Sequence, residues 1–486
     1  IGAVFIFAAL LTLSAYTGDT AFAHLRANAS TLPDGVKNVV FVLALIGFGS
    51  KSGIVPLHIW MARAYPVAPS PFATMMSAAM VNTGIYGLVR VVFDLIGSPP
   101  AWWGITLVIV GVISALTGIL RALAESDLRR MLAFSSTENI GIIYVGLGAA
   151  ALLLAYDQAL LASFAMLAAI VHTINHALFK GLLFMGTGAV MQSTRTSHIE
   201  ALGGLIKTMP WTAACFFIGS AAIAALPPLN GFVGEWMLIQ SMLQVMQHLP
   251  FTGMQFVIPL AAAALVLTSG LAAICFVKAF GIAFLAKPRT DAARDAVEVG
   301  WAMRIGMLML AVGCIVLGAG APLLLRFISP AVEQLMSPVY VPETFGFIPI
   351  AGLDVQETQL SLSIVLVVLV GLALALYLLS RFVGKRGQWP RAPAWGCGID
   401  LQPDMAYTGV SLVQPVKRSF VWFYRQEGRW ELPLEERLEN RIYRPLKRWV
   451  IRWSERAKVI QNGNIRLYLL YMFCALILLL LWQGGG

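Results

Sequence analysis

The chain has 486 residues, and 58% of them are hydrophobic while only 12% are charged, which excludes a soluble protein of this length. Windows of about 20 apolar residues, enough for a helix to cross a bilayer, recur along it. The sequence therefore predicts an all-α polytopic membrane protein and not a β-barrel. Residues 381–466 hold 17 of the 34 Lys and Arg residues behind the net charge of +10, which favours a cytoplasmic face over nucleic-acid binding.

Eleven membrane segments are predicted in chain order. They cover residues 1–16, 36–63, 72–96, 101–124, 128–153, 157–190, 209–247, 256–287, 303–329, 359–381 and 466–483. The first begins at Ile1 without an initiator methionine or a signal peptide. We therefore expect that the chain is truncated here or that its first part is a separate chain.

The second segment, 36–63, carries a lysine within its apolar run. Lys51 stands in "GFGSKSGIVP", where the glycines and Pro56 predict a break in the helix. Because a charge deep in the membrane is costly and marks functional sites, we expect Lys51 to take part in ion movement. The alternative is a side chain that extends to the membrane interface. His58 and Arg63 follow near the inner surface.

The fifth segment, 128–153, contains a carboxyl group in "SSTENIGIIY". Glu138 is either part of an ion pathway or a hydrogen-bonding partner for Asn139 or for a neighbouring helix. Arg129 and its charged neighbours in "ESDLRRM" are interpreted as a charge cluster at the membrane interface.

The sixth segment, 157–190, contains "HTINHALFKGLLF". The spacing i, i+4, i+8 places His172, His176 and Lys180 on one helical face. Such a row favours proton transfer, because imidazole titrates near neutral pH. The alternatives are hydrogen-bonded core histidines or a metal-binding pair, and HxxxH without HExxH or a third ligand is a weak zinc signal. No metal site is therefore predicted.

The seventh segment, 209–247, is interrupted by "ALPPLNGF", which cannot continue a regular helix. If the segment crosses the membrane once, the basic loops 121–130 and 286–302 share one side and the acidic loop 330–358 lies on the other. Because basic loops are expected together on the cytoplasmic side, we predict a single crossing by one broken helix. Glu235 follows the break. We interpret it as a carboxylate of an ion pathway, as a cap of the second half-helix, or as both.

The two broken helices, 36–63 and 209–247, are expected to run in opposite directions. Broken helices in matching positions of two inverted halves indicate an ion pathway. This predicts the following organisation: the remainder of a first inverted repeat at 1–96, a second repeat at 97–290, additional membrane helices at 291–383, a basic cytoplasmic or interfacial segment at 384–465, and a final membrane helix at 466–486.

The tail and the cysteines carry no catalytic signal. Residues 415–465 mix basic and aromatic side chains, which favours an amphipathic segment against lipid headgroups or sister subunits over RNA binding. None of the five cysteines stands in a CxxC or metal-ligand spacing. No nucleophile–base pair or nucleotide fingerprint is present, so we expect no catalytic centre and no cofactor in this chain.

Together, these motifs resemble the antiporter-like subunits shared by respiratory complex I, Mrp-type cation/proton antiporters and membrane-bound hydrogenases, over residues 36–290. "KSGIVPLHIWMARAYPVAPSP" resembles the broken-helix lysine motif, "HTINHALFKGLLF" the central histidine helix, and "LPPLNGFVGEWMLI" the second broken helix. Within the family, "STENIGII" and the tail "WGCGIDLQPDMAYTGVSLVQPVKRSF" are most similar to the hydrogenase-4 and formate hydrogenlyase branch.

The resemblance implies a proton-translocating subunit without a redox centre, in the bacterial cytoplasmic membrane beside other membrane subunits and a peripheral [NiFe]-hydrogenase arm. Its implied relay comprises Lys51, His172, His176, Lys180 and Glu235, with Glu138 as a further group. Open alternatives are a complex I-type quinone oxidoreductase subunit, an Mrp-type Na⁺/H⁺ antiporter subunit, and a structural anchor with an inactive channel.

The sequence departs from the family pattern in two places. Asn82 occupies a position where members often have Lys or His, so the first half-pathway is expected to use water or Glu138 instead. A glutamate that pairs with the broken-helix lysine would lie before Ile1, so a chain without it needs a partner for Lys51 from another subunit. The accessory positions are Asn82, His58, Arg129 and Lys278.

Overall fold

The structure is a computed structural model that describes residues 2–97, 99–248, 256–339, 348–349, 359–383, 399, 402–426, 429–430, 439–458, 463 and 465–483. It divides into two compact units, Ile1–Ser419 and Phe420–Gly486. Cys397, most of the acidic loop 330–358 and much of the basic segment 384–465 lie outside the described residues.

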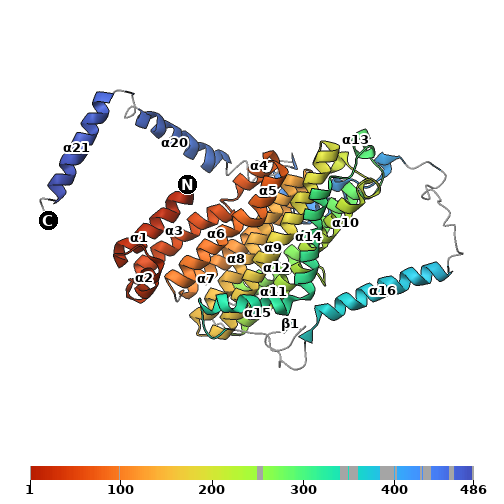
Figure 1. Cartoon of the computed structure of the whole chain (residues 1–486), viewed down its shortest axis with the longest axis horizontal. Coiled ribbons are helices and arrows are strands. Elements are labelled where there is room, and N and C mark those ends of the chain that lie inside the picture. The colour runs from red at the N-terminus through yellow and green to blue at the C-terminus, as the bar shows by residue number, and fades with distance from the viewer. Residues whose placement is uncertain are drawn as a thin grey trace. The chain divides into compact units, whose positions relative to one another are not determined.

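The first unit is a helical bundle (Figure 1). Its helices are α1 Gly2–Thr17, α2 Phe22–Ala27, α3 Asp34–Ser52, α4 Ile59–Val67, α5 Ser70–Met75, α6 Val81–Val89, α7 Ala101–Ala124, α8 Leu128–Ala155, α9 Ala159–Thr194, α10 Pro210–Ile223, α11 Asn230–His248, α12 Val257–Phe284, α13 Asp291–Arg294, α14 Trp301–Ala319, α15 Ala321–Glu333, α16 Leu362–Val383 and α17 Gly409–Ser419. The short strands β1 Ile348–Pro349 and β2 Gln359–Leu360 pair antiparallel.

The second unit contains α18 Val421–Tyr424, the antiparallel strands β3 Arg425–Gln426 and β4 Arg429–Trp430, α20 Arg444–Ala457 and the apolar α21 Ile465–Gln483. In α20, basic residues alternate with tryptophans, as in "RPLKRWVIRW". This composition is typical of a helix at a membrane interface.

Among the described residues, eight helices are long and apolar enough to cross a membrane, and α1, α10 and the first part of α21 are shorter apolar helices. Every one of the eleven predicted segments overlaps one of these helices. The predicted class of all-α polytopic membrane protein is therefore confirmed. Of the eight, α8 is the most completely buried, because α7, α9, α11 and α4 pack around it.

Both predicted helix breaks are present. α3 ends at Ser52, and Gly53 follows in the left-handed conformation with φ +82° before α4 begins at Ile59. α10 ends at Ile223, and α11 begins at Asn230 after a turn over Leu226–Asn230 that contains two prolines. Each break interrupts the backbone ladder inside an apolar bundle, so its polar groups need partners from other helices.

The prediction of one uninterrupted segment over 303–329 was wrong. The structure ends α14 at Ala319 and starts α15 at Ala321. Pro322 lies in the first turn of α15, where a missing backbone N–H costs nothing. A Cβ on Gly320 would lie 2.8 Å from the carbonyl oxygen of Val316, so the chain packs tightly at the turn. α15 buries one face, through residues that include Leu325 and Val332, and exposes the other.

Helices α7 and α8 pack backbone against backbone. The glycines responsible are spaced by seven residues: Gly104, Gly111 and Gly118 in α7, and Gly141 and Gly148 in α8. A Cβ atom on Gly141 would lie 2.5 Å from the carbonyl oxygen of Gly111, and one on Gly118 would lie 2.5 Å from the backbone nitrogen of Glu138. Small residues permit such close approach in membrane helices, and here they hold the Glu138 turn against α7.

This packing predicts that Gly111→Val destabilises the protein. Because the obstructing atoms belong to the α8 backbone, they cannot rotate away as a side chain would, and overpacking of this kind costs about 1–3 kcal/mol. The melting temperature of the purified protein in detergent should fall. Gly270→Val in α12 is the control, because a Cβ there has nothing within 4 Å. Equal melting temperatures for the two variants would contradict the prediction.

Candidate ion pathway

Helix α9 carries three ionisable side chains into the centre of the bundle. His172, His176 and Lys180 each have 0% exposure and follow one another at four-residue spacing. In an apolar bundle, every donor and acceptor on these side chains has to be met by a neighbouring helix or by water. The contacts of this row therefore show which helices build the site.

Lys180 is held by helix α8. Its Nζ donates to the carbonyl oxygen of Leu132 at 3.0 Å and to the hydroxyl of Ser135. Both acceptors belong to the turn of α8 that precedes Glu138. An ammonium group in this position is separated from lipid on all sides, and these hydrogen bonds replace part of its hydration.

Each histidine makes one hydrogen bond to an asparagine. His172 Nε2 lies 3.2 Å from Asn139 Oδ1, and His176 Nδ1 lies 3.3 Å from Asn82 Oδ1. The amide nitrogens of both asparagines donate elsewhere, to the carbonyl oxygens of Ser135 and Ala78. The asparagine oxygens therefore accept, and we infer that His172 carries its proton on Nε2 and His176 on Nδ1.

The second nitrogen of each ring faces the bundle interior. His172 Nδ1 and His176 Nε2 are buried and make no hydrogen bond to the described residues. A Cβ on Gly234 of α11 would lie 2.6 Å from His172 Nδ1, so only glycine fits there. Each ring thus combines a held N–H with a second nitrogen that can accept a proton.

Two carboxyl groups lie beside the histidine row. Glu138 of α8 is 1% exposed, and the charges of Lys180 and Glu235 both act on it. Glu235 of α11 is 6% exposed and accepts a hydrogen bond from the hydroxyl of Ser269 in α12. The structure therefore brings five of the predicted relay residues together: His172, His176, Lys180, Glu138 and Glu235.

The two helix breaks are tied to the same helices as this row. In the first break, the backbone nitrogen of Val55 donates to Ser114 Oγ at 3.0 Å, and Ser52 Oγ lies 2.9 Å from the hydroxyl of Tyr144. In the second, Asn175 Nδ2 donates to the carbonyl oxygen of Asn230 at 2.7 Å. The breaks are thereby positioned by α7, α8 and α9.

A family model described as "NADH:quinone oxidoreductase/Mrp antiporter, TM" matches residues 1–259. The chain belongs to this family. It is 36% identical to "Hydrogenase-4 component B" of Escherichia coli (strain K12), over 99% of this chain and 74% of that protein. It is 35% identical to "Formate hydrogenlyase subunit 3" of the same organism, over 78% of this chain and 60% of that protein.

The fold extends to solved structures of the same type. The membrane-bound sulfane sulfur reductase, an archaeal respiratory membrane complex, has a chain with a TM-score of 0.73 and 22% identity, over 99% of this chain and 74% of that one. This protein is therefore an antiporter-like membrane subunit of the complex I, Mrp and group 4 hydrogenase type.

In this antiporter-like subunit, Lys51 and His58 lie apart from the buried row. Lys51 stands in the last turn of α3 with an exposed side chain. His58 is buried at the start of α4, with its ring centre 6.4 Å from that of Phe134. Lys51 was predicted to belong with the histidines, but among the described residues it makes no direct contact with them.

Arg129 connects helices at one end of the bundle. Its guanidinium donates to the carbonyl oxygens of Pro66 and Ala68 at 2.9 and 2.8 Å and to Ser70 Oγ at 2.6 Å. These contacts fix the turn between α4 and α5 against the start of α8. They give Arg129 a positioning role in the fold.

Lys278 lies near the end of α12 and caps α7. Its Nζ donates to the carbonyl oxygens of Leu123 and Glu125, each at 2.7 Å. Helix α17 covers it, since a Cβ on Gly409 would lie 3.4 Å from Lys278 Cδ. In α17, burial lowers the pKa of Lys417, and the carboxylate of Glu125 partly opposes this.

Two hydrogen bonds from the start of α17 hold this helix in place. The carboxylate of Glu200 accepts from the backbone nitrogens of Gly409 at 2.7 Å and Val410 at 3.3 Å. Arg289 donates to the carbonyl oxygen of Tyr407 at 2.8 Å. A carboxylate at the start of a helix satisfies free N–H groups and complements the helix dipole.

Sequence reasoning missed the uncharged side chains that hold the charged ones. Ser135, Ser269 and Asn175 carry no signal alone, because Ser and Asn are common and their partners lie in other helices. Ser135 had an indirect signal: it stands four residues before Asn139 in the polar run "SSTEN", on the same helical face.

We predict that Glu200→Ala releases α17 from the end of α12. Hydrogen bonds to a charged group contribute about 1.5–3 kcal/mol, so amide hydrogen exchange over residues 405–419 should become roughly tenfold faster or more. Hydrogen-exchange mass spectrometry of the purified protein measures this.

Glu298→Ala is the matched control for this experiment. Glu298 caps α10 in the same way, through the backbone nitrogens of Trp211 and Thr212, and its loss should leave residues 405–419 unchanged. Equal exchange over 405–419 in the wild type and in Glu200→Ala would refute the role of Glu200.

Proposed function

We propose that this chain is the proton-translocating subunit of a membrane-bound redox complex of the group 4 [NiFe]-hydrogenase or formate hydrogenlyase type. The observation that carries the proposal is the row His172, His176 and Lys180, fully buried and hydrogen-bonded to α8 and α6. Rows of ionisable residues inside membrane helices are costly, and they mark ion pathways. The printed names of the two relatives support this type of complex.

In the proposed relay, each histidine takes up and gives back a proton at its open nitrogen. A proton that arrives at Nδ1 of His172 or Nε2 of His176 makes the ring cationic. The same nitrogen then passes a proton to the next group of the row, and the ring returns to its neutral form. The other ring nitrogen keeps its N–H on Asn139 or Asn82 throughout, so the asparagines orient the rings and carry no proton themselves.

Charge coupling drives the proposed transport. In a low-dielectric interior, one added charge changes the energy of its neighbours far more than it does in water. Glu138 and Lys180 are both buried in this interior, so a change of charge on either group acts on the other. Redox chemistry in a partner subunit would change the charge at one end, and the change would pass along this row.

The ends of the proposed pathway are Lys51 and Lys278. The exposed position of Lys51 suits contact with a carboxylate of a neighbouring subunit. Lys278 lies at the opposite repeat, beneath α17, close to the ends of α7 and α12. In this proposal, residues 1–96 and 97–290 act as two inverted halves, and the basic tail faces the cytoplasm beside the peripheral hydrogenase arm.

We predict that Lys180→Met and Glu235→Gln stop proton movement. The whole complex, reconstituted in proteoliposomes, should retain its redox activity while redox-driven proton uptake falls at least about tenfold. Lys37→Met, at the start of α3, is the control and should leave uptake unchanged. Subunit content, measured by quantitative mass spectrometry, shows whether each variant assembles.

The outcomes separate the proposal from its alternatives. Unchanged proton uptake in assembled Lys180→Met and Glu235→Gln complexes contradicts the relay and leaves a structural anchor. Redox-driven Na⁺ uptake that persists with a protonophore identifies sodium as the ion pumped directly and contradicts the proton relay. Na⁺ uptake that a protonophore abolishes is the result expected for an Mrp-type Na⁺/H⁺ antiporter subunit.

A further inference from the structure

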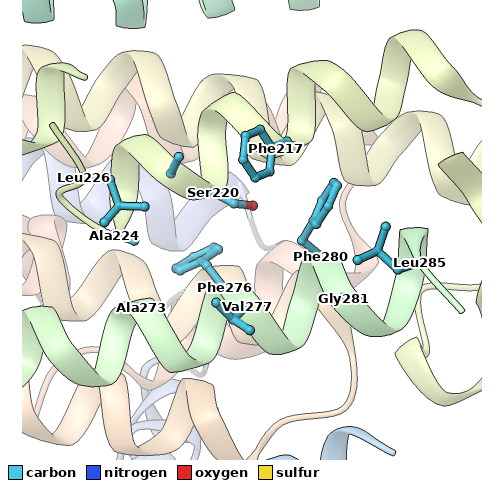
Figure 2. A pocket seen from close by; sticks show the side chains of 11 residues that line it. Phe217, Ser220, Ala224, Leu226, Ala273, Phe276, Val277, Phe280, Gly281 and Leu285 are labelled. Atoms are coloured by element: carbon cyan, nitrogen blue, oxygen red, sulfur yellow. The ribbon is translucent and has the colours of Figure 1, made fainter. Parts of the chain in front are cut away.

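A groove lies between α10 and α12 on the outside of the bundle (Figure 2). It encloses about 160 Å³, and Ser220 is its one polar lining residue among the described side chains. Val277 and Phe217 at its rim are 66% and 55% exposed. The groove therefore opens toward the bilayer and away from the buried ionisable row.

Small residues between large ones create the groove. Ala221, Ala224 and Gly281 leave the hollow, and the aromatic rings of Phe217 and Phe280 stand beside it (Figure 2), with their centres 5.2 Å apart. A Cβ on Gly281 would meet nothing within 4 Å. Close helix packing does not require this glycine, so the space it leaves is open for another molecule.

The length of the groove matches one membrane leaflet. It runs along α12 from Leu285 to Ala273, which is about 18 Å of helix at 1.5 Å per residue. The hydrocarbon core is about 30 Å thick, so one leaflet is about 15 Å deep. One end lies where the chain leaves α12, next to Gly204, and the other lies at the break after α10.

Two exposed lysines flank the interfacial end of the groove. Lys207 stands three residues before α10, and Lys287 stands two residues after Leu285. Two other charged groups of this region contact the protein itself: Glu298 caps α10, and Arg289 donates to the carbonyl oxygen of Tyr407. The interfacial end is therefore suited to an anionic headgroup, which basic residues at a membrane surface attract.

We propose that this groove binds one acyl chain of an anionic phospholipid, with the lipid phosphate at Lys207 and Lys287. A partner helix does not fit, since a helix with side chains is about 10 Å wide, whereas the enclosed space of about 160 Å³ is close to the cavity of about 150 Å³ that holds benzene. The groove therefore encloses a few methylenes of an acyl chain, and the rest of the chain lies along its open side. This inference stands independently of the proposed proton pathway.

The test measures lipid retention by the intact complex. Delipidated complex is incubated with phosphatidylglycerol or phosphatidylcholine of identical acyl chains, and bound lipid is counted by native mass spectrometry. Gly281→Phe fills the groove and should lose one bound phosphatidylglycerol. Gly270→Phe is the matched control, because it adds the same ring to the same helix beyond the groove, where a Cβ also meets nothing within 4 Å.

A double variant tests whether binding requires an anionic headgroup. Lys207→Gln with Lys287→Gln should lower phosphatidylglycerol affinity at least about tenfold and leave phosphatidylcholine binding unchanged, whereas Lys37→Gln should change neither. Equal retention of the two lipids by the wild type overturns the proposal, and so does full phosphatidylglycerol retention by Gly281→Phe.

A cross-linking experiment on the wild-type complex keeps the proposal testable if a variant fails to assemble. Phosphatidylglycerol with a photoreactive diazirine in its acyl chain should label peptides that contain residues 217–226 and 273–285. Labelling confined to other helices overturns the proposed site.

Discussion

The cost of placing ionisable groups in a membrane interior governs this structure. Lys180 keeps its position because α8 supplies two oxygen acceptors, and the two histidines keep theirs because asparagines of α8 and α6 orient them. These partners are contributed by different helices. The bundle and the row therefore depend on each other, and a shift of α8 relative to α9 would remove several hydrogen bonds at once.

The same requirement explains how the chain tolerates two broken helices. A break frees backbone groups that lipid cannot satisfy, and here side chains of α7 and α9 meet two of them, Ser114 at Val55 and Asn175 at Asn230. Tyr144 of α8 adds a contact to the side chain of Ser52. The two breaks use different chemistry, a serine–tyrosine pair in the first and an asparagine pair in the second. Both breaks are therefore tied by polar contacts to helices of the bundle interior.

Sequence reasoning reached the fold class, both breaks and the alignment of His172, His176 and Lys180, because each of these features is local. Periodicity, a proline or a spacing of four residues is visible within one segment. The partners Ser135, Asn175 and Ser269 were not predictable, since each contact joins helices far apart in the sequence. The turn between α14 and α15 was missed because one glycine and one proline weaken an apolar pattern only slightly.

The seven-residue glycine spacing of α7 and α8 has a mechanical consequence. If one helix slid past the other by a single turn, side chains such as Leu107 would collide with α8 backbone that a glycine of α7 now contacts. The pair therefore has one register and no neighbouring one. Ratchet motions, which need two such registers, are excluded for α7 and α8. Relative to each other, these two helices thus form a fixed pair within the subunit.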